Sequence, residues 1–147
     1  MADKKKFEDK KKFETDAIRT QIPTTGEREH STPLYMTSSY LFESTEQARA
    51  LFASEMDGNV YSRYTNPNTS EFVDKMCKLE GAEAGVATAS GMSAVFSSLA
   101  ALLNQGDHVL ASRSLFGSTH QVLSQILSKW GITFTYADLD DTDSWES

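Results

Sequence analysis

The chain of 147 residues is long enough to bury one modest hydrophobic core, which favours a single domain. Its formal net charge of -7 at pH 7 argues against nucleic acid as a partner of the folded body, and no apolar run approaches the roughly 20 residues that cross a membrane. Cys77 is the only cysteine, which excludes an internal disulfide and favours a cytoplasmic location.

Residues 1–16 form a basic tail. The hexapeptide Asp-Lys-Lys-Lys-Phe-Glu occurs twice in tandem, at residues 3–8 and 9–14. Such a lysine-rich segment attracts nucleic acid or an acidic membrane surface, but the interleaved acids partly neutralise it. Because so polar a segment has little apolar surface to bury, we predict a solvated, disordered tail.

Residues 17–60 predict an arm that packs onto a neighbouring subunit. Pro23, Gly26 and Pro33 interrupt any helical or strand period. The segment nevertheless carries apolar side chains that need cover, namely Leu34, Tyr35, Met36, Tyr40, Leu41 and Phe42. Residues 44–47 have the spacing of a capping box, which predicts one short helix at the end of the arm.

From residue 61 onward, predicted helices and strands alternate. A turn at Asn66–Pro67 leads into a helix that Asn68 or Thr69 caps and Gly81 ends. Residues 84–88 are a weak strand candidate. A second helix follows, and its apolar face consists of Met92, Val95, Phe96, Leu99 and Leu103.

The remaining elements repeat this alternation. Residues 108–111 predict a buried strand, and Ser118 or Thr119 caps a helix that Gly131 ends. The side chains of that helix that we expect to face inward are Leu123, Ile126, Leu127 and Trp130. Alternating apolar residues over 132–136 predict another strand, so we expect βαβ crossovers and a mostly parallel sheet.

The predicted sheet domain is incomplete. A capping-box pattern over residues 143–146 predicts a further helix, yet the chain reaches Ser147 one residue later. Three parallel strands also leave open sheet edges. We therefore expect residues 61–147 to be the start of a larger domain, and the chain to be the N-terminal part of a longer protein.

Three motifs are suited to a flat, phosphorylated ligand. Tyr61 and Arg63 share one side of a segment expected to be extended, and a guanidinium fork matches the geometry of phosphate. Gly91 and Met92 open a helix, where backbone N–H groups face an anion. Phe116 follows a strand, at the edge where open α/β sheets bind ligands, and its ring can stack on a flat cofactor.

Other polar residues point to no further site. Arg113 lies near Phe116 and is interpreted as a surface cation. His30, His108 and His120 lack the spacing of metal ligands, so we expect no metal site. A generic nucleotide-binding domain is disfavoured, because the chain has neither a Gly-x-Gly-x-x-Gly turn nor a Gly-Lys-Ser/Thr loop.

The order and spacing of these motifs resemble the pyridoxal-phosphate enzymes of cysteine and methionine metabolism, the cystathionine gamma-synthase family. The resemblance runs from Ala17 to the end of the chain and includes the stretches 61–67, 79–83 and 90–92. It implies an aspartate-aminotransferase-like α/β fold (fold type I). The chain would supply the N-terminal arm and the first βα units of the large domain.

The resemblance also implies a cofactor, pyridoxal 5'-phosphate, and roles for five residues of this chain. Tyr61 and Arg63 correspond to the pair that binds the cofactor phosphate across a dimer interface. Gly91 and Met92 correspond to its backbone cradle, and Phe116 to the residue that stacks on its ring. Most members have tyrosine where Phe116 stands, so a phenol assigned to proton handling is absent here.

The stretch 115–120 is most similar to the sulfhydrylase branch, whose members form homocysteine from an activated homoserine ester and sulfide. This implies a homodimer or homotetramer that uses a succinyl ester of homoserine. The lysine, aspartate and arginine that the chemistry requires would lie beyond Ser147, so no residue of this chain is expected to be catalytic. Two alternatives remain, a cystathionine synthase or lyase of the same family, and a non-catalytic truncated fragment.

Overall fold

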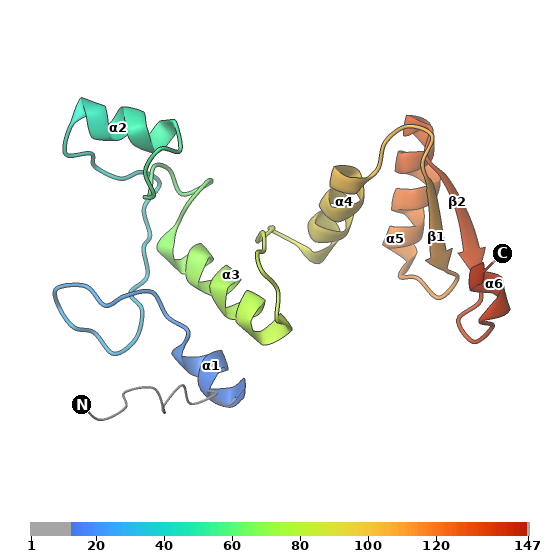
Figure 1. Cartoon of the computed structure of the whole chain (residues 1–147), viewed down its shortest axis with the longest axis horizontal. Helices are drawn as coiled ribbons and strands as arrows, with labels where there is room; N and C mark the ends of the chain where they lie inside the picture. Colours follow the sequence, from blue (N-terminus) through green and yellow to red (C-terminus); the bar gives the residue numbers. More distant parts are fainter. Residues whose placement is uncertain (1–12, 147) are drawn as a thin grey trace, which may run out of the picture. The chain divides into compact units, whose positions relative to one another are not determined.

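The chain folds as two units, Met1–Ala87 and Thr88–Ser147 (Figure 1). The computed structural model describes residues 13–146. Most of the expected tail lies outside these residues, but its last part, residues 13–16, belongs to helix α1, Phe13–Arg19. None of the helices within the described range combines the length and the apolar content that a bilayer crossing requires.

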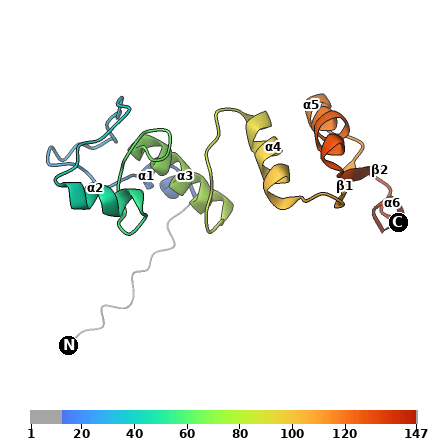
Figure 2. The ribbon, with the colours of Figure 1, turned by 90° about the horizontal axis from the view of Figure 1, so that it is seen from above.

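The first unit contains α1, α2 (Thr45–Phe52) and α3 (Pro67–Glu80) in its described part. α1 contacts α3, and the two helices lie side by side in both views (Figures 1 and 2). Between α1 and α2, residues 20–44 form neither a helix nor a regular strand. An isolated antiparallel bridge pairs Ser39 of this segment with Tyr61.

The short helix predicted at the end of the arm is confirmed as α2. Ser44 is extended, and its hydroxyl accepts a hydrogen bond from the N–H of Gln47 at 3.0 Å, as an N-cap does. The return bond differs from a standard capping box, because the amide oxygen of Gln47 accepts from Glu43 at 2.6 Å. The cap therefore extends to the residue before Ser44.

The cap predicted for α3 was wrong. Asn66, and not Asn68 or Thr69, is the N-cap, with φ -141° and its side-chain oxygen accepting from the N–H of Asn68 at 2.9 Å. Pro67 explains the difference, because its fixed φ and missing N–H suit the first position of a helix. The predicted end is confirmed, since Gly81 has φ 68° and terminates the helix.

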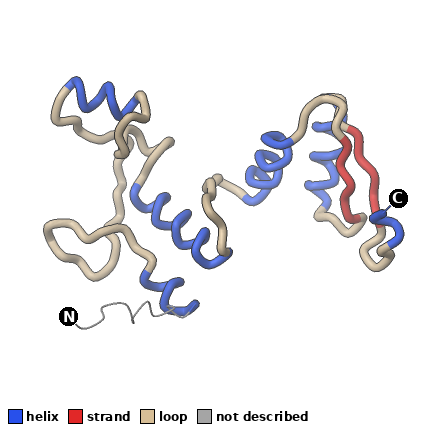
Figure 3. The backbone as a smooth tube through the Cα atoms, viewed as in Figure 1, coloured by secondary structure: helices blue, strands red, loops and turns tan. Residues whose placement is uncertain are grey.

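The second unit is an α/β arrangement with a parallel strand pair. Its described elements are α4 (Gly91–Leu102), β1 (His108–Ser112), α5 (Gly117–Gln121), β2 (Thr133–Ala137) and α6 (Asp143–Glu146). β1 and β2 pair in parallel register from His108 opposite Thr133 to Ser112 opposite Ala137. The strands run side by side in Figure 3, with the helix that begins at α5 against them. The predicted βαβ crossover is therefore confirmed.

The strand predicted at 84–88 does not form in the described structure. These residues adopt no regular conformation, and Val86 is 89% exposed. A strand requires a neighbour that satisfies its backbone groups, and no strand among residues 13–146 pairs with this segment. The small side chains at 84–88 contribute little packing that would compensate.

The helix after β1 also differs from the sequence prediction. It begins at Gly117, and the carbonyl of Phe116 accepts from the N–H groups of Thr119 and His120, so neither Ser118 nor Thr119 is its cap. α5 continues as a π-helical turn, Val122–Ile126, and a 3₁₀ turn, Leu127–Trp130. The N–H of Leu127 donates to the carbonyls of both Leu123 and Val122, which marks the wider turn.

The wide turn changes which side chains are buried. Leu123 and Leu127 are 2% and 0% exposed, as predicted, whereas Ile126 and Trp130, which were also expected to face inward, are 39% and 48% exposed. A π turn holds about one residue more than an α turn, so the regular spacing no longer holds. The buried side chains Val122, Leu123, Leu127 and Ile132 form the core of the second unit, with half-buried neighbours from α4 and both strands.

This core predicts that substitutions of two adjacent residues differ in their effect on stability. Leu127→Ala in the full-length protein should lower the free energy of unfolding by about 2–5 kcal/mol, because it empties a fully buried position. Ile126→Ala should cost only about 1 kcal/mol. Urea unfolding of both variants measures the difference. Equal losses would mean that the helix is regular and Ile126 faces the core.

Candidate functional site

Tyr61 and Arg63 lie in a tight turn, not in the extended segment that the sequence predicted. The carbonyl of Tyr61 accepts from the N–H of Tyr64 at 2.8 Å and from that of Thr65 at 3.0 Å. Residues 61–64 therefore form a hydrogen-bonded turn, called here the Tyr61–Tyr64 turn. The arm bridge at Ser39 and the start of α3 constrain the backbone on either side, and this long-range pairing overrides the local tendency to extend.

The expected proximity of Tyr61 and Arg63 nevertheless holds. The guanidinium carbon of Arg63 lies 5.3 Å from the ring centre of Tyr61 and 5.3 Å from that of Tyr64. The two rings meet edge-on at 6.4 Å. The contact between Arg63 and the ring of Tyr64 was not predicted from the sequence, although Tyr64 directly follows Arg63.

Arg63 keeps its charge available. No carboxylate among residues 13–146 lies within salt-bridge distance of it, whereas Arg49 pairs with Glu46 and Glu55. Two aromatic faces restrict the guanidinium without neutralising it. The arrangement presents an oriented cation to an anion such as phosphate.

The arm holds the Tyr61–Tyr64 turn through Ser62. The N–H of Ser62 donates to the carbonyl of Ser38 at 2.9 Å, and its hydroxyl donates to the carbonyl of Thr37. Together with the bridge between Ser39 and Tyr61, these bonds pair the turn with three consecutive arm residues. The arm thus packs against one side of the turn that carries Arg63.

Further along α3, Glu71 fixes the earlier part of the arm. Its carboxylate accepts from the hydroxyl of Thr32 and from the N–H of Ile22, the latter at 3.2 Å, and lies 3.7 Å from the ammonium of Lys75. The side chain is 15% exposed. The Thr32 hydroxyl, followed by Ile22 and Lys75, holds the pKa of Glu71 below its usual value.

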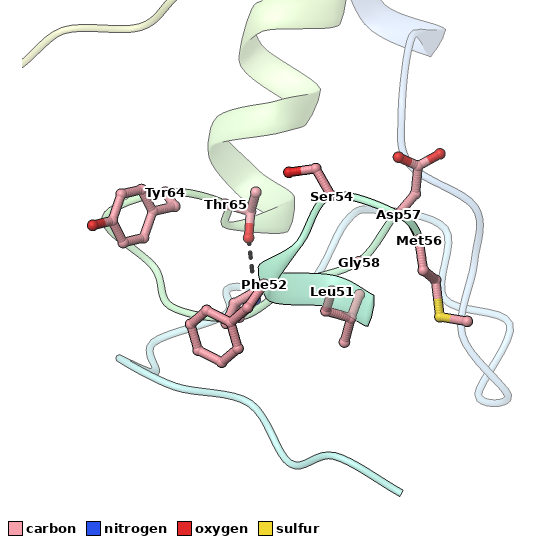
Figure 4. A pocket seen from close by; sticks show the side chains of 9 residues that line it. Leu51, Phe52, Ser54, Met56, Asp57, Gly58, Tyr64 and Thr65 are labelled. Carbon is pink, nitrogen blue, oxygen red and sulfur yellow. Dashed lines mark hydrogen bonds between the residues drawn. The ribbon is translucent and has the colours of Figure 1, made fainter. Parts of the chain in front are cut away.

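A cavity adjoins the turn but is unsuited to phosphate. It measures about 450 Å³ and lies between the end of α2 and Tyr64 (Figure 4). Leu51, Phe52 and Met56 line it, and Asp57 is the charged residue in its wall. Thr65 also lines the cavity, and its hydroxyl accepts from the N–H of Val60 at 3.3 Å. The carboxylate of Asp57 repels an anion, and the apolar side chains offer it no hydrogen-bond donor.

In the second unit, the start of α4 offers two unused donors. Ser90 caps the helix by accepting from the N–H of Ser93 at 3.1 Å. The N–H groups of Gly91 and Met92 have no acceptor among the described residues. A side chain built on Gly91 would meet no atom within 4 Å, so the space before these donors is open.

Phe116 lies at the same end of the second unit. It follows the carboxyl end of β1, and Figure 1 shows that α4 and α5 both begin at this end. Its ring is 72% exposed and can take a flat partner. Arg113, in contrast, is bonded to the carboxylate of Asp138 at 2.8 Å and lies over the ring of Tyr136. The interpretation of Arg113 as a surface cation is consistent with that pairing.

Comparison with known proteins identifies the family of this chain. Residues 14–147 match the family described as Cys/Met metabolism PLP-dependent enzyme. An O-succinylhomoserine sulfhydrylase from Pseudomonas aeruginosa is 47% identical over 92% of this chain and 34% of its own length. Another from Mycobacterium tuberculosis is 46% identical over 90% of this chain and 32% of its own length.

A solved structure shares the fold. It is assigned as an O-acetylhomoserine (thiol)-lyase from Campylobacter jejuni and contains N'-pyridoxyl-lysine-5'-monophosphate. The TM-score is 0.83 at 36% identity, over 91% of this chain and 33% of that one. This chain therefore spans about a third of the length of the relatives it matches.

The shared fold and the family match together place the chain in the class of pyridoxal-phosphate enzymes of fold type I. The chain belongs to the Cys/Met metabolism family of these enzymes, whose cofactor is pyridoxal phosphate. The family, fold class and cofactor expected from the sequence are thereby confirmed. The individual roles of Tyr61, Arg63, Gly91, Met92 and Phe116 stay predictions.

The residues present fit that cofactor within each unit. Arg63 supplies an oriented, uncompensated cation for a phosphate. In the second unit, the open space before Gly91 and the free N–H groups of the α4 start can accommodate an anion. The exposed ring of Phe116 provides a stacking surface for a pyridine.

Glu71 makes the attachment of the arm dependent on pH. Because its pKa is lowered on folding, the charged form stabilises the fold at neutral pH, and this contribution is lost as the pH falls through the lowered pKa. Glu71→Gln should lower the free energy of unfolding by about 1–2 kcal/mol at neutral pH. Unfolding of both proteins across the acidic range should show the difference shrinking.

The matched control is Glu83→Gln, a change of the same type at an exposed carboxylate. It should leave stability unchanged across this range. A difference between wild type and Glu71→Gln that persists unaltered in acid would contradict the assignment of the effect to the Glu71 charge.

Proposed function

We propose that the full-length protein is a pyridoxal-phosphate-dependent O-succinylhomoserine sulfhydrylase, a transferase of methionine biosynthesis by transsulfuration. It would form homocysteine from O-succinylhomoserine and sulfide. The carbon–oxygen bond of the ester breaks, succinate leaves with the electron pair, and a carbon–sulfur bond forms at the same carbon. Pyridoxal phosphate supplies the electron sink for this replacement when bound.

One observation supports this choice of substrate above the others. Identity to the two O-succinylhomoserine sulfhydrylases is 46–47%, whereas identity to the structure assigned as an O-acetylhomoserine (thiol)-lyase is 36%. An O-acetyl-L-homoserine sulfhydrylase matched by sequence is likewise less similar, at 38% identity over 84% of this chain.

The residues of this chain would hold and orient the cofactor. Arg63 donates to the phosphate with its guanidinium fork, and the two flanking rings keep that fork in place. Tyr61 adds its phenol as a further donor. Gly91 and Met92 donate through their backbone N–H groups at the α4 start, and Phe116 stacks on the pyridine ring.

Self-association completes the proposal. The arm, residues 17–60, would contact a neighbouring subunit of a homodimer or homotetramer. Its exposed apolar side chains support this, since Leu34, Met36 and Leu41 are 80%, 92% and 101% exposed. A cytoplasmic location is supported by the single cysteine. We expect the first 147 residues alone to be inactive, because the catalytic lysine would lie elsewhere.

The substrate assignment is tested with the full-length protein loaded with pyridoxal phosphate. O-succinylhomoserine and sulfide should give homocysteine, with a higher kcat/KM than O-acetylhomoserine under the same conditions. Cystathionine formed from cysteine in place of sulfide would identify a cystathionine synthase. Ammonia released without incorporation of any thiol would identify a lyase, and either result overturns the proposal.

The phosphate role of Arg63 is tested by affinity. Arg63→Lys keeps the charge but loses the planar fork, so the Kd of the apoprotein for pyridoxal phosphate should rise about tenfold or more. An absorbance titration measures it. Arg49→Met is the control, because Arg49 also lies in the first unit but is already paired with two glutamates. Similar Kd values for both variants would contradict the role.

A further inference from the structure

One half-buried amide, that of Asn66, touches every segment around the Tyr61–Tyr64 turn. Its nitrogen lies 3.0 Å from the carbonyl oxygen of Tyr35, 3.2 Å from the hydroxyl of Ser62 and 3.3 Å from the phenol of Tyr40. Its oxygen accepts from the N–H of Asn68 at the start of α3. The side chain therefore links the arm, the turn and the helix.

Chemistry determines the orientation of this amide. The carbonyl of Tyr35 only accepts, and the N–H of Asn68 only donates. A flipped amide would set two acceptors against each other at Tyr35 and two donors against each other at Asn68. The amide nitrogen of Asn66 must therefore face the arm and Ser62, and its oxygen must face α3.

The contact with Ser62 matters because Ser62 is the residue between Tyr61 and Arg63. Its own N–H and hydroxyl are bonded to the arm at Ser38 and Thr37. Asn66 adds a bond from the helix side, so Ser62 is held from two directions. The backbone that carries Arg63 then has little freedom to rotate.

We propose that Asn66 is a positioning residue for the phosphate site: its amide nitrogen sets the Tyr61–Tyr64 turn so that Arg63 meets a phosphate in the correct orientation. The proposal rests on the role proposed above for Arg63. It adds a function to Asn66 beyond capping α3, and the two functions use different atoms of one side chain.

Two substitutions separate these functions. Asn66→Ser retains a good N-cap and stays neutral, but its short side chain has no amide nitrogen to reach Tyr35, Tyr40 or Ser62. Asn66→Asp retains the shape and the capping oxygen and replaces the donor nitrogen by an acceptor. Ser44→Asn, at the cap of α2, is the control for a change of cap alone.

The readout is the affinity of the full-length apoprotein for pyridoxal phosphate compared with pyridoxal, which lacks the phosphate. A general loss of structure weakens both. Misplacement of Arg63 weakens mainly the first, so the ratio of the two affinities should fall roughly tenfold in Asn66→Ser and Asn66→Asp and stay unchanged in Ser44→Asn. Arg63→Lys provides the reference for a lost phosphate contact.

The possible results are distinguishable. If the ratio falls in Arg63→Lys and in both Asn66 variants, the positioning role is supported. If it falls in Arg63→Lys alone, Asn66 is only a cap, and this inference is overturned while the role of Arg63 stands. If Arg63→Lys also leaves the ratio unchanged, the phosphate role of Arg63 is wrong, and the role of Asn66 is overturned with it.

Discussion

The first unit depends on where Pro67 allows α3 to begin. Proline favours the first helical position, so the preceding Asn66 becomes the cap and is held in an extended conformation. From there its amide reaches the arm. Two residues further on, the side chain of Asn68 accepts from the N–H of Tyr35 and donates to the carbonyl of Pro33. The start of one helix thus organises a segment that has no regular secondary structure of its own.

The second unit is organised by parallel pairing. β1 and β2 run in one direction, so the helices that precede them must run in the other, and α4 and α5 begin beside the strands' carboxyl ends (Figure 1). The free N–H groups of Gly91 and Met92 and the ring of Phe116 therefore lie at one end. A polar cradle and an aromatic surface come together through topology, and no special local sequence is required.

Local signals in the sequence were sufficient at some helix ends. Ser44 begins its helix and Gly81 ends its helix as expected, because a cap depends on neighbouring backbone groups. Two other cap predictions were wrong, since α3 takes Asn66 as its cap and the helix after β1 begins at Gly117. Further predictions failed where distant contacts decide. The Tyr61–Tyr64 turn forms against the arm, and the strand expected at 84–88 lacks a partner within the described residues. The five candidate site residues were proposed from their motifs alone. Asn66 could not be proposed in this way, because its bonds to Tyr35 and Tyr40 form only across the fold.

The π turn at Val122–Ile126 has a consequence for comparing this chain with its relatives. It holds one residue more than a regular turn while keeping Leu123 and Leu127 in the core. A relative with a regular helix here would cover the same strands with one residue fewer. Residue-by-residue correspondence would then need a single-residue gap inside the helix, and an alignment without one would match Ile126 with a core position that it does not occupy.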